Sequence, residues 1–186
     1  MWPTKGVVDN MDMLEEGTPN PMGEHLVEEL KWVHGMIREN LEIISGMVGR
    51  INGGHPAGEV QAEIKDFADT SVIWTLRINC LRYCSFVHGH HGHEDASFFP
   101  GLRKANPDLC PVIDKLEADH REVSDYLDAV EDAANRLRGD EAARVELATA
   151  LNGLAEHLIT HLDYEETNLN PTLRRLIRWP IAHQGN

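Results

Sequence analysis

The sequence has no long apolar run, few cysteines and few basic residues, and each shortage excludes a class of protein. No charge-free stretch approaches the roughly 18 apolar residues that a membrane helix needs, so we expect no membrane span. The three cysteines, Cys80, Cys84 and Cys110, form no Cys-x-x-Cys pair and indicate neither a disulfide framework nor a cysteine zinc site. Seventeen Lys and Arg against 31 Asp and Glu give a formal net charge of -14, which repels nucleic acid and anionic lipid.

The amino terminus lacks the basic and then apolar pattern of a secretory signal, and an acidic run soon follows it. We therefore expect a cytoplasmic protein. The rest of the composition is ordinary, with 186 residues, about one domain's length, of which 41% are hydrophobic and 26% charged. Histidine is the exception, because the chain has 11 of them and four lie between His88 and His93.

Apolar residues recur at three- and four-residue steps in four long segments, which is the pattern of amphipathic helices. Four long helices with short links predict an all-α, antiparallel up-down-up-down four-helix bundle over residues 22–178. Residues 1–21, rich in Pro and Gly, are interpreted as a tail or strap, and residues 179–186 as a carboxyl-terminal tail. The predicted helices end at Gly53-Gly54, near Pro100-Gly101 and at Gly139-Asp140, and the last one ends or bends at Pro171.

Several ionisable side chains fall on helix faces that are otherwise apolar, which is costly unless the charge is paired or bound to a metal. At about 100° per residue, Glu94 lies on the centre line of the second helix's apolar face. His90 and His91 flank it, whereas His88 and His93 point away. Equivalent positions on the other three helices are occupied by His34, His120, His161 and Glu165.

Antiparallel packing brings these residues to one end of the bundle. The spacing His-xxx-Glu occurs twice, from His90 to Glu94 and from His161 to Glu165, and it places both side chains on one helix face, one turn apart. His91 is a candidate additional ligand. The predicted metal ligands are His34, His90, Glu94, His120, His161 and Glu165.

Four imidazoles and two carboxylates are too many ligands for a tetrahedral zinc site, and they lack the all-oxygen character that calcium and magnesium prefer. They suit two non-haem iron ions. If each glutamate bridges the two ions and an oxide or hydroxide does so as well, coordination positions remain open for a small ligand. Open positions predict reactivity towards dioxygen or peroxide.

The ordered pattern of these residues resembles the hemerythrin-like, HHE cation-binding family over roughly residues 22–175. It comprises His34, the segment His90-His91-Gly92-His93-Glu94 through Pro100, then His120, and then His161-xxx-Glu165. The resemblance implies a four-helix bundle that holds a diiron centre with two bridging carboxylates. It also implies O2, H2O2 or NO as small ligands, because family members bind dioxygen, sense oxygen or iron, respond to nitric oxide or decompose peroxide.

Two departures from the oxygen-carrying hemerythrins bear on function. Those proteins have His-xxx-His on the third helix, but four residues after His120 this chain has Ser124. Their last ligand is an aspartate five residues after the histidine, whereas Glu165 follows His161 by four. A second iron with one histidine fewer would be more open to peroxide, unless His91 supplies the missing imidazole.

A rival diiron family, the ferritin-like carboxylate proteins, needs Glu-x-x-His on two helices. Only Glu117 to His120 fits that spacing here, and Glu117 lies off the apolar face. The sequence thus favours the hypothesis of a diiron protein that reacts with oxygen species in oxidative or nitrosative stress. One form of this hypothesis is a binding or sensing protein without turnover, and the other is a catalase-like enzyme that disproportionates hydrogen peroxide.

Overall fold

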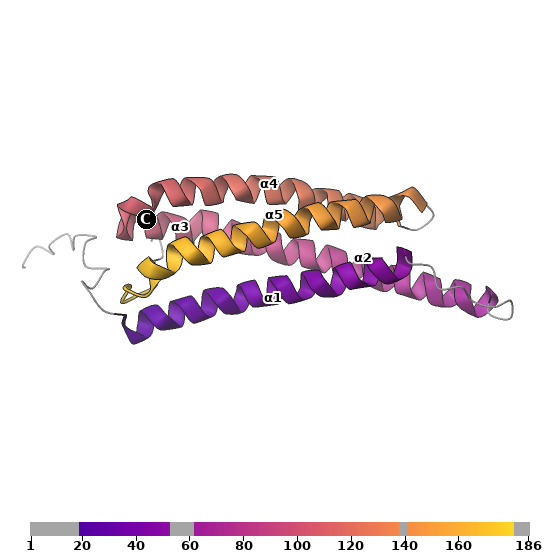
Figure 1. Cartoon of the computed structure of the whole chain (residues 1–186), viewed down its shortest axis with the longest axis horizontal. Coiled ribbons are helices and arrows are strands. Elements are labelled where there is room, and N and C mark those ends of the chain that lie inside the picture. The colour runs from indigo at the N-terminus through magenta and orange to yellow at the C-terminus, as the bar shows by residue number, and fades with distance from the viewer. Residues whose placement is uncertain (1–18, 53–61, 138–140, 181–186) are drawn as a thin grey trace, which may run out of the picture.

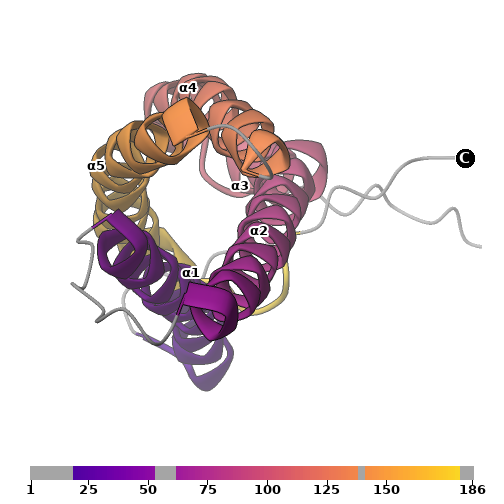
Figure 2. The ribbon, with the colours of Figure 1, turned by 90° about the vertical axis from the view of Figure 1, so that its right-hand side faces the viewer.

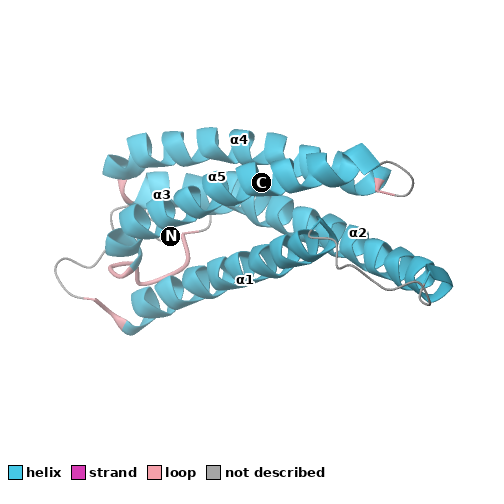
Figure 3. Ribbon diagram, turned by 45° about the vertical axis from the view of Figure 1, so that its right-hand side comes forward, coloured by secondary structure: helices cyan, strands magenta, loops and turns pink. Residues whose placement is uncertain are grey.

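The computed structural model describes residues 19–52, 62–137 and 141–180, and nearly all of them are helical (Figures 1 and 3). Between the second and third long helices lie a π-helical turn (Glu94–Phe98), the short helix α3 (Phe99–Ala105) and a 3₁₀ turn (Pro107–Leu109). These ranges contain no strand, so the predicted all-α fold is confirmed. None of their helices is long and apolar enough to cross a membrane. The four long helices are α1 (Pro21–Asn52), α2 (Ala62–His93), α4 (Cys110–Arg136) and α5 (Glu141–Leu173).

The long helices form a ring in which each contacts two neighbours. Helix α1 contacts α2 and α5, and α4 contacts the same two helices from the other side (Figure 2). The chain runs in one direction along α1 and α4 and in the other along α2 and α5 (Figure 1). The first halves of α1 and α4 therefore lie at the same end as the second halves of α2 and α5, as expected for an up-down-up-down bundle.

Helix α1 begins with a side-chain cap. The Asn20 side chain accepts a hydrogen bond from the Gly23 backbone N–H at 3.0 Å, and Pro21, which has no N–H to satisfy, occupies the first helical position. The helix thus starts one residue before the boundary predicted at residue 22. Residues 1–18 of the predicted tail or strap lie outside the described residues, as does the predicted stop at Gly139-Asp140.

The second long helix does not end at Pro100 as predicted. Instead the α-helix widens into the π turn at Glu94, where the Phe99 N–H bonds the Glu94 carbonyl five residues back, and then resumes as α3. Proline cannot donate to the helical ladder and its ring collides with the carbonyl four residues before it. A wider turn just ahead of Pro100 accommodates both effects, and π turns of this kind often occur at functional sites.

Pro171 lies inside α5, which continues for two residues and ends at Leu173. The Arg174 backbone N–H still bonds the Asn170 carbonyl, at 3.0 Å. The break that the sequence predicts at Pro171 therefore occurs two residues later, after Leu173. The residues that follow a proline can remain helical, because the proline ring obstructs only the turn before it.

Buried apolar side chains form two clusters, one on each side of a polar layer. On α1, for example, His34 separates Leu30 in one cluster from Ile37 in the other. The cluster that contains Ile37 fills most of the length of the bundle, and the one with Leu30 fills the end near α3. The polar layer between the clusters consists of His34, His90, His91, Glu94, His120, His161 and Glu165.

Trp179 and Pro180 lie against this end of the bundle. The Pro180 carbonyl oxygen approaches Gly101 so closely that a Cβ added there would collide with it. The indole of Trp179 meets the Phe98 ring edge to face, with centroids 6.0 Å apart. The segment predicted as a tail from residue 179 therefore contacts the bundle through its first two residues.

We expect Gly101→Ala to destabilise the protein by about 1–3 kcal/mol, because the new methyl group must displace the segment that carries Pro180. Urea unfolding would measure this, and trypsin cleavage after Arg178 would report release of the segment. Gly49→Ala is the matched control, since no atom lies near its added Cβ and a helical alanine is favoured over glycine. If both variants gain stability, the close approach at Gly101 is not a constraint.

Candidate metal centre

The seven polar side chains of the layer converge from all four long helices and the π turn. His34 and Glu165 are completely buried, and Glu94 is 2% exposed. The His90 side chain is the most accessible of the seven, at 11%. The structure therefore brings together all six ligands predicted from the sequence, together with His91.

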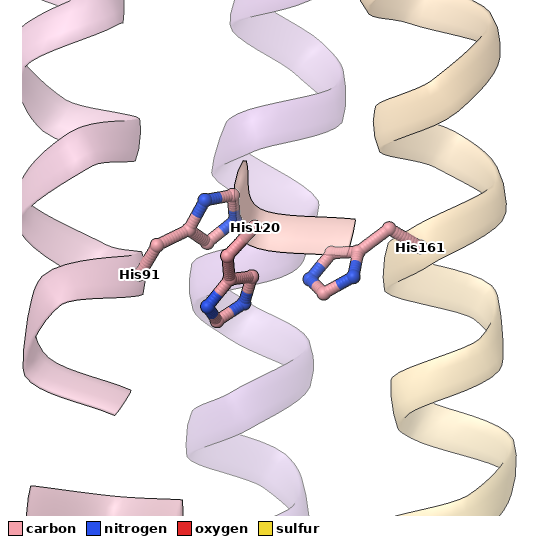
Figure 4. Close-up of side chains that lie close together, drawn as sticks. All are labelled: His91, His120 and His161. Carbon is pink, nitrogen blue, oxygen red and sulfur yellow. The ribbon is translucent and has the colours of Figure 1, made fainter. Parts of the chain in front are cut away.

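The seven residues divide into two groups, each compact enough to surround one ion. Within each group the ligand atoms lie within 4.8 Å of one another. His91, His120 and His161 form the first group, and Figure 4 shows their rings converging from α2, α4 and α5. The second group is His34, His90, Glu94 and Glu165.

Each glutamate reaches both groups. For Glu94, Oε1 lies 3.3 Å from His90 Nε2, and Oε2 lies 3.5 Å from His120 Nε2. For Glu165, Oε2 lies 3.4 Å from His34 Nε2 and 3.7 Å from His161 Nε2. Both carboxylates thus lie between the two groups, which is the position that a shared ligand of two ions must occupy.

These side chains fit metal ions because their inward atoms have no other partner. Buried polar groups in proteins are normally hydrogen-bonded, and an unpaired one costs about 1–3 kcal/mol. In the described part of the chain, most of the buried side-chain nitrogen and oxygen atoms without a hydrogen-bond partner belong to this layer. They are Nε2 of His34, His90, His91, His120 and His161, Nδ1 of His161, and both carboxylate oxygens of Glu94 and Glu165.

Carboxylates outside the layer hold two of the imidazoles by their Nδ1 atoms. His34 Nδ1 lies 3.0 Å from Glu166 Oε1, which also accepts from Arg38 at 2.8 Å. His120 Nδ1 lies 2.7 Å from Asp95 Oδ1. An imidazole that donates from Nδ1 presents a lone pair at Nε2, so these contacts orient both rings as ligands.

Sequence reasoning missed these outer carboxylates, although a signal was present. In both His-xxx-Glu motifs the inward glutamate is followed directly by a second acid, Asp95 after Glu94 and Glu166 after Glu165. An adjacent residue is rotated by about 100° around the helix, so it faces a neighbouring helix rather than the centre. There it meets the far side of a histidine from that helix.

Burial favours the neutral form of four of the imidazoles. It lowers the pKa of His90 to about 4 and the pKa of His120 to about 3. Burial lowers the pKa values of His91 and His161 as well. Neutral imidazole is the form that binds a metal ion, so these four rings can bind one without first losing a proton.

The two carboxyl groups behave differently. Burial and the nearby Glu165 carboxylate raise the pKa of Glu94 well above its ordinary value. Burial acts on Glu165 in the same direction, but the neighbouring imidazoles of His34, His161 and His90 outweigh it, and the pKa of Glu165 lies below its ordinary value. Of the two carboxyl groups, Glu94 therefore binds a proton more tightly than Glu165 does in the metal-free protein.

His91, the candidate additional ligand, lies beside His120 and His161 in the first group. Its ring stacks on that of His120 with centroids 4.0 Å apart, and it lies 5.2 Å from the ring of His161. Ser124, one turn after His120, is half-buried and belongs to neither group. The layer thus contains five imidazoles, and His91 lies where it could supply the histidine that Ser124 does not provide.

The other described histidines lie outside the layer, as the helical phase predicts for His88 and His93. His93 and His157 are exposed, and His88 is half-exposed with Nε2 3.6 Å from Asp128. His25 pairs with Glu29, at 3.1 Å. His55 and His183 lie outside the described residues. Cys80, Cys84 and Tyr83 are buried in the larger apolar cluster.

An apolar pocket of about 210 Å³ opens on the second group. Its inner wall includes His90 and Glu94, and its outer walls include Trp32, Phe98 and Trp179. The first group lies on the other side of the layer, where His120 is covered by the Phe99 ring at 5.4 Å. A small apolar molecule therefore reaches the layer most directly beside His90.

Comparisons with known proteins agree with the residue pattern. The family model of the hemerythrin HHE cation binding domain matches residues 25–173, well over half of the chain. No curated protein and no solved structure matches. The matched range coincides with the resemblance found from the ligands over roughly residues 22–175, which is thereby confirmed. The chain belongs to the hemerythrin HHE cation-binding family.

Proposed function

We propose that this protein is a non-haem diiron protein that binds O2, H2O2 or NO, acting as a carrier or sensor in oxidative or nitrosative stress. The observation that carries the proposal is the polar layer itself. It sets five imidazoles and two carboxylates, buried and without other partners, in two adjacent groups. A set rich in imidazole and poor in carboxylate suits iron better than calcium or magnesium, and seven ligands exceed one zinc ion.

In this proposal His91, His120 and His161 hold one ion, His34 and His90 hold the other, and Glu94 and Glu165 are shared. When bound, two irons with an oxide or hydroxide bridge supply redox chemistry and open positions for a small ligand. The protein's own residues select that ligand. The apolar walls beside His90 admit an uncharged diatomic or peroxide molecule and disfavour anions, which would lose their hydration there.

The carrier or sensor form is favoured because His91 supplies a fifth imidazole. The peroxide-disproportionating enzyme is the second candidate, and one observation favours it. Glu29 and His93 line the same pocket as His90 and Glu94. Titratable groups beside a reacting ligand are what a peroxide enzyme needs to accept and return protons.

Metal analysis tests the diiron proposal. Protein expressed with iron is expected to hold about two irons per chain, because the two groups have separate donors and shared carboxylates. The exposed His93→Ala variant is expected to hold the same amount. One tightly bound metal per chain, or a preference for zinc over iron, would contradict the proposal.

An oxygen electrode separates the two candidate functions. A carrier or sensor is expected to release no dioxygen when peroxide is added to the iron-loaded protein. If dioxygen is released, and if His93→Gln lowers the rate without changing the iron content, the enzyme is the correct alternative, since His93 then acts on protons and not on the metal.

A further inference from the structure

A second opening reaches the polar layer, and its chemistry is opposite to that of the apolar pocket. It is a groove of about 310 Å³ between α4 and α5. Most of its lining is charged or polar and comes from outward positions of the two helices. The lining includes Lys115, Asp119, Glu122, Glu156, His157 and His161.

His161 forms the inner end of this groove. The residue is 2% exposed, and neither ring nitrogen has a hydrogen-bond partner. Its Nδ1 faces the groove, 3.8 Å from Asp119 Oδ2, and its Nε2 faces the layer, 3.7 Å from Glu165 Oε2. One buried and unpaired imidazole thus connects the groove with the proposed metal centre.

The groove attracts cations. It contains three carboxylates and one ammonium group, and the Lys115 ammonium is paired with Asp119 and lies over the Tyr164 ring, 4.5 Å from its centroid. Glu122 and Glu156 are exposed and can turn towards an ion. His157 is held at the rim by the Tyr126 hydroxyl, 2.9 Å from its Nε2. The groove therefore keeps an excess of negative charge, and a concave surface with such an excess raises the local concentration of cations.

The groove is also the right size for a hydrated ion. Six waters occupy about 180 Å³ at roughly 30 Å³ each, so a divalent cation fits within 310 Å³ together with its shell of water. The pocket beside His90 also contains two carboxylates, Glu29 and Glu94, but it is smaller, at about 210 Å³, and most of its wall is apolar, so a hydrated cation would lose more of its water there. The two openings therefore sort uncharged ligands from cations.

From these observations we infer that the α4–α5 groove is the route by which hydrated divalent iron reaches the buried centre. Glu122 and Glu156 capture the ion at the rim, Asp119 replaces part of its water, and His161 receives it at the layer. The inference rests on the proposed metal centre and adds to it a path that belongs to α4 and α5 alone.

Cobalt(II) uptake by the metal-free protein tests the route, because cobalt(II) does not oxidise during the experiment and absorbs visible light when histidine binds it. In stopped-flow mixing at low ionic strength, Glu122→Gln/Glu156→Gln is expected to slow uptake about tenfold. The difference is expected to shrink as salt is added, since these carboxylates are exposed. The final absorbance is expected to match that of the wild-type protein.

The matched control removes the same charge elsewhere. Glu39 and Glu42 are exposed on α1, diagonally across the bundle from α4, so Glu39→Gln/Glu42→Gln is expected to leave the rate within about twofold of wild type. Thr160→Arg, which places a bulky cation in the groove, is expected to slow uptake at least as much as the double Gln variant.

Three results would overturn the route. If the groove and control variants slow uptake equally, the effect is one of net charge. If the groove variants leave the rate unchanged, the ion takes a different path. If the double Gln variant lowers the final absorbance, Glu122 or Glu156 is a metal ligand. Failure of the wild-type protein to bind cobalt(II) at all would instead overturn the proposed metal centre, and the route with it.

Discussion

Glu94→Leu is expected to lower the iron content from two ions per chain to one or none while making the metal-free protein more stable. Glu94 is 2% exposed and neither carboxylate oxygen has a hydrogen-bond partner, so its burial opposes folding in the absence of metal. Leucine has a similar volume and belongs between the two apolar clusters. Replacing buried ionisable groups by apolar ones has stabilised other proteins by about 1–4 kcal/mol, and we expect a gain of that order in urea unfolding.

Tyr83→Phe is the control that separates these two effects. The Tyr83 hydroxyl is also buried without a partner, but it lies outside both groups of candidate ligands. Its removal is expected to stabilise the metal-free protein by about 1 kcal/mol and to leave the iron content unchanged. If Glu94→Leu retains both irons, the carboxylate is not shared. If it destabilises the metal-free protein, the polar layer contributes to folding on its own.

The polar layer is expected to favour metal binding but to lower the stability of the metal-free protein, and this conflict explains how the sequence reveals the centre. A chain selected for stability alone would place leucine where His34 and His120 interrupt their apolar rows. Helical period is a local property, and at 100° per residue it fixes which side chains face inward. The inward orientation of the six candidate ligands could therefore be predicted from the sequence alone.

His91 shows where that reasoning stops. It lies on the flank of the second helix's apolar face, and a flanking side chain points inward or outward according to which neighbour it meets. The structure resolves this because the ring stacks on His120 from α4, a contact between residues of different helices. Periodicity along one helix contains no information about such a contact.

The π turn and the outer carboxylates could not be predicted from the sequence for a similar reason. Pro100 signals a disturbance, but whether the helix stops or widens depends on what the following residues can bury. Here α3 continues because Phe99 and Leu102 are completely buried in the smaller apolar cluster. Asp95 and Glu166 were missed because their partners lie on other helices, and only the packed bundle brings each acid to the histidine whose Nδ1 it contacts.

The metal-free protein is expected to lose stability steeply as the pH falls from about 6.5 to 4. The unfolded chain protonates its histidines near pH 6.5, whereas burial lowers the pKa of His90 to about 4 and the pKa of His120 to about 3 in the folded protein. The unfolded state therefore binds more protons throughout this interval, and each such proton lowers the free energy of unfolding by about 1.4 kcal/mol per pH unit.

Burial also lowers the pKa values of His91 and His161, so these residues add to the loss of stability at low pH. Two acids act in the opposite sense, because burial raises the pKa of Glu94 and raises the pKa of Asp95 to about 6. A raised acid pKa makes the folded state hold a proton that the unfolded state has released above about pH 4. With four such histidines and two such acids, the unfolded state binds about two protons more than the folded state does. The free energy of unfolding therefore still falls as the pH falls.

Thermal unfolding of the metal-free protein between pH 7.5 and 4.5 would measure this dependence, and His91→Leu is expected to flatten it because one buried imidazole no longer resists protonation. Tyr83→Phe is expected to leave the slope unchanged, because burial raises the pKa of the Tyr83 hydroxyl and it binds its proton throughout this interval. Iron is expected to be released in the same interval, since protons and metal compete for the same Nε2 atoms. An unfolding temperature that stays constant from pH 7.5 to 4.5 would mean that water reaches the layer and solvates these rings. The diiron proposal depends on donor atoms that are buried and have no other partner, so that result would contradict it.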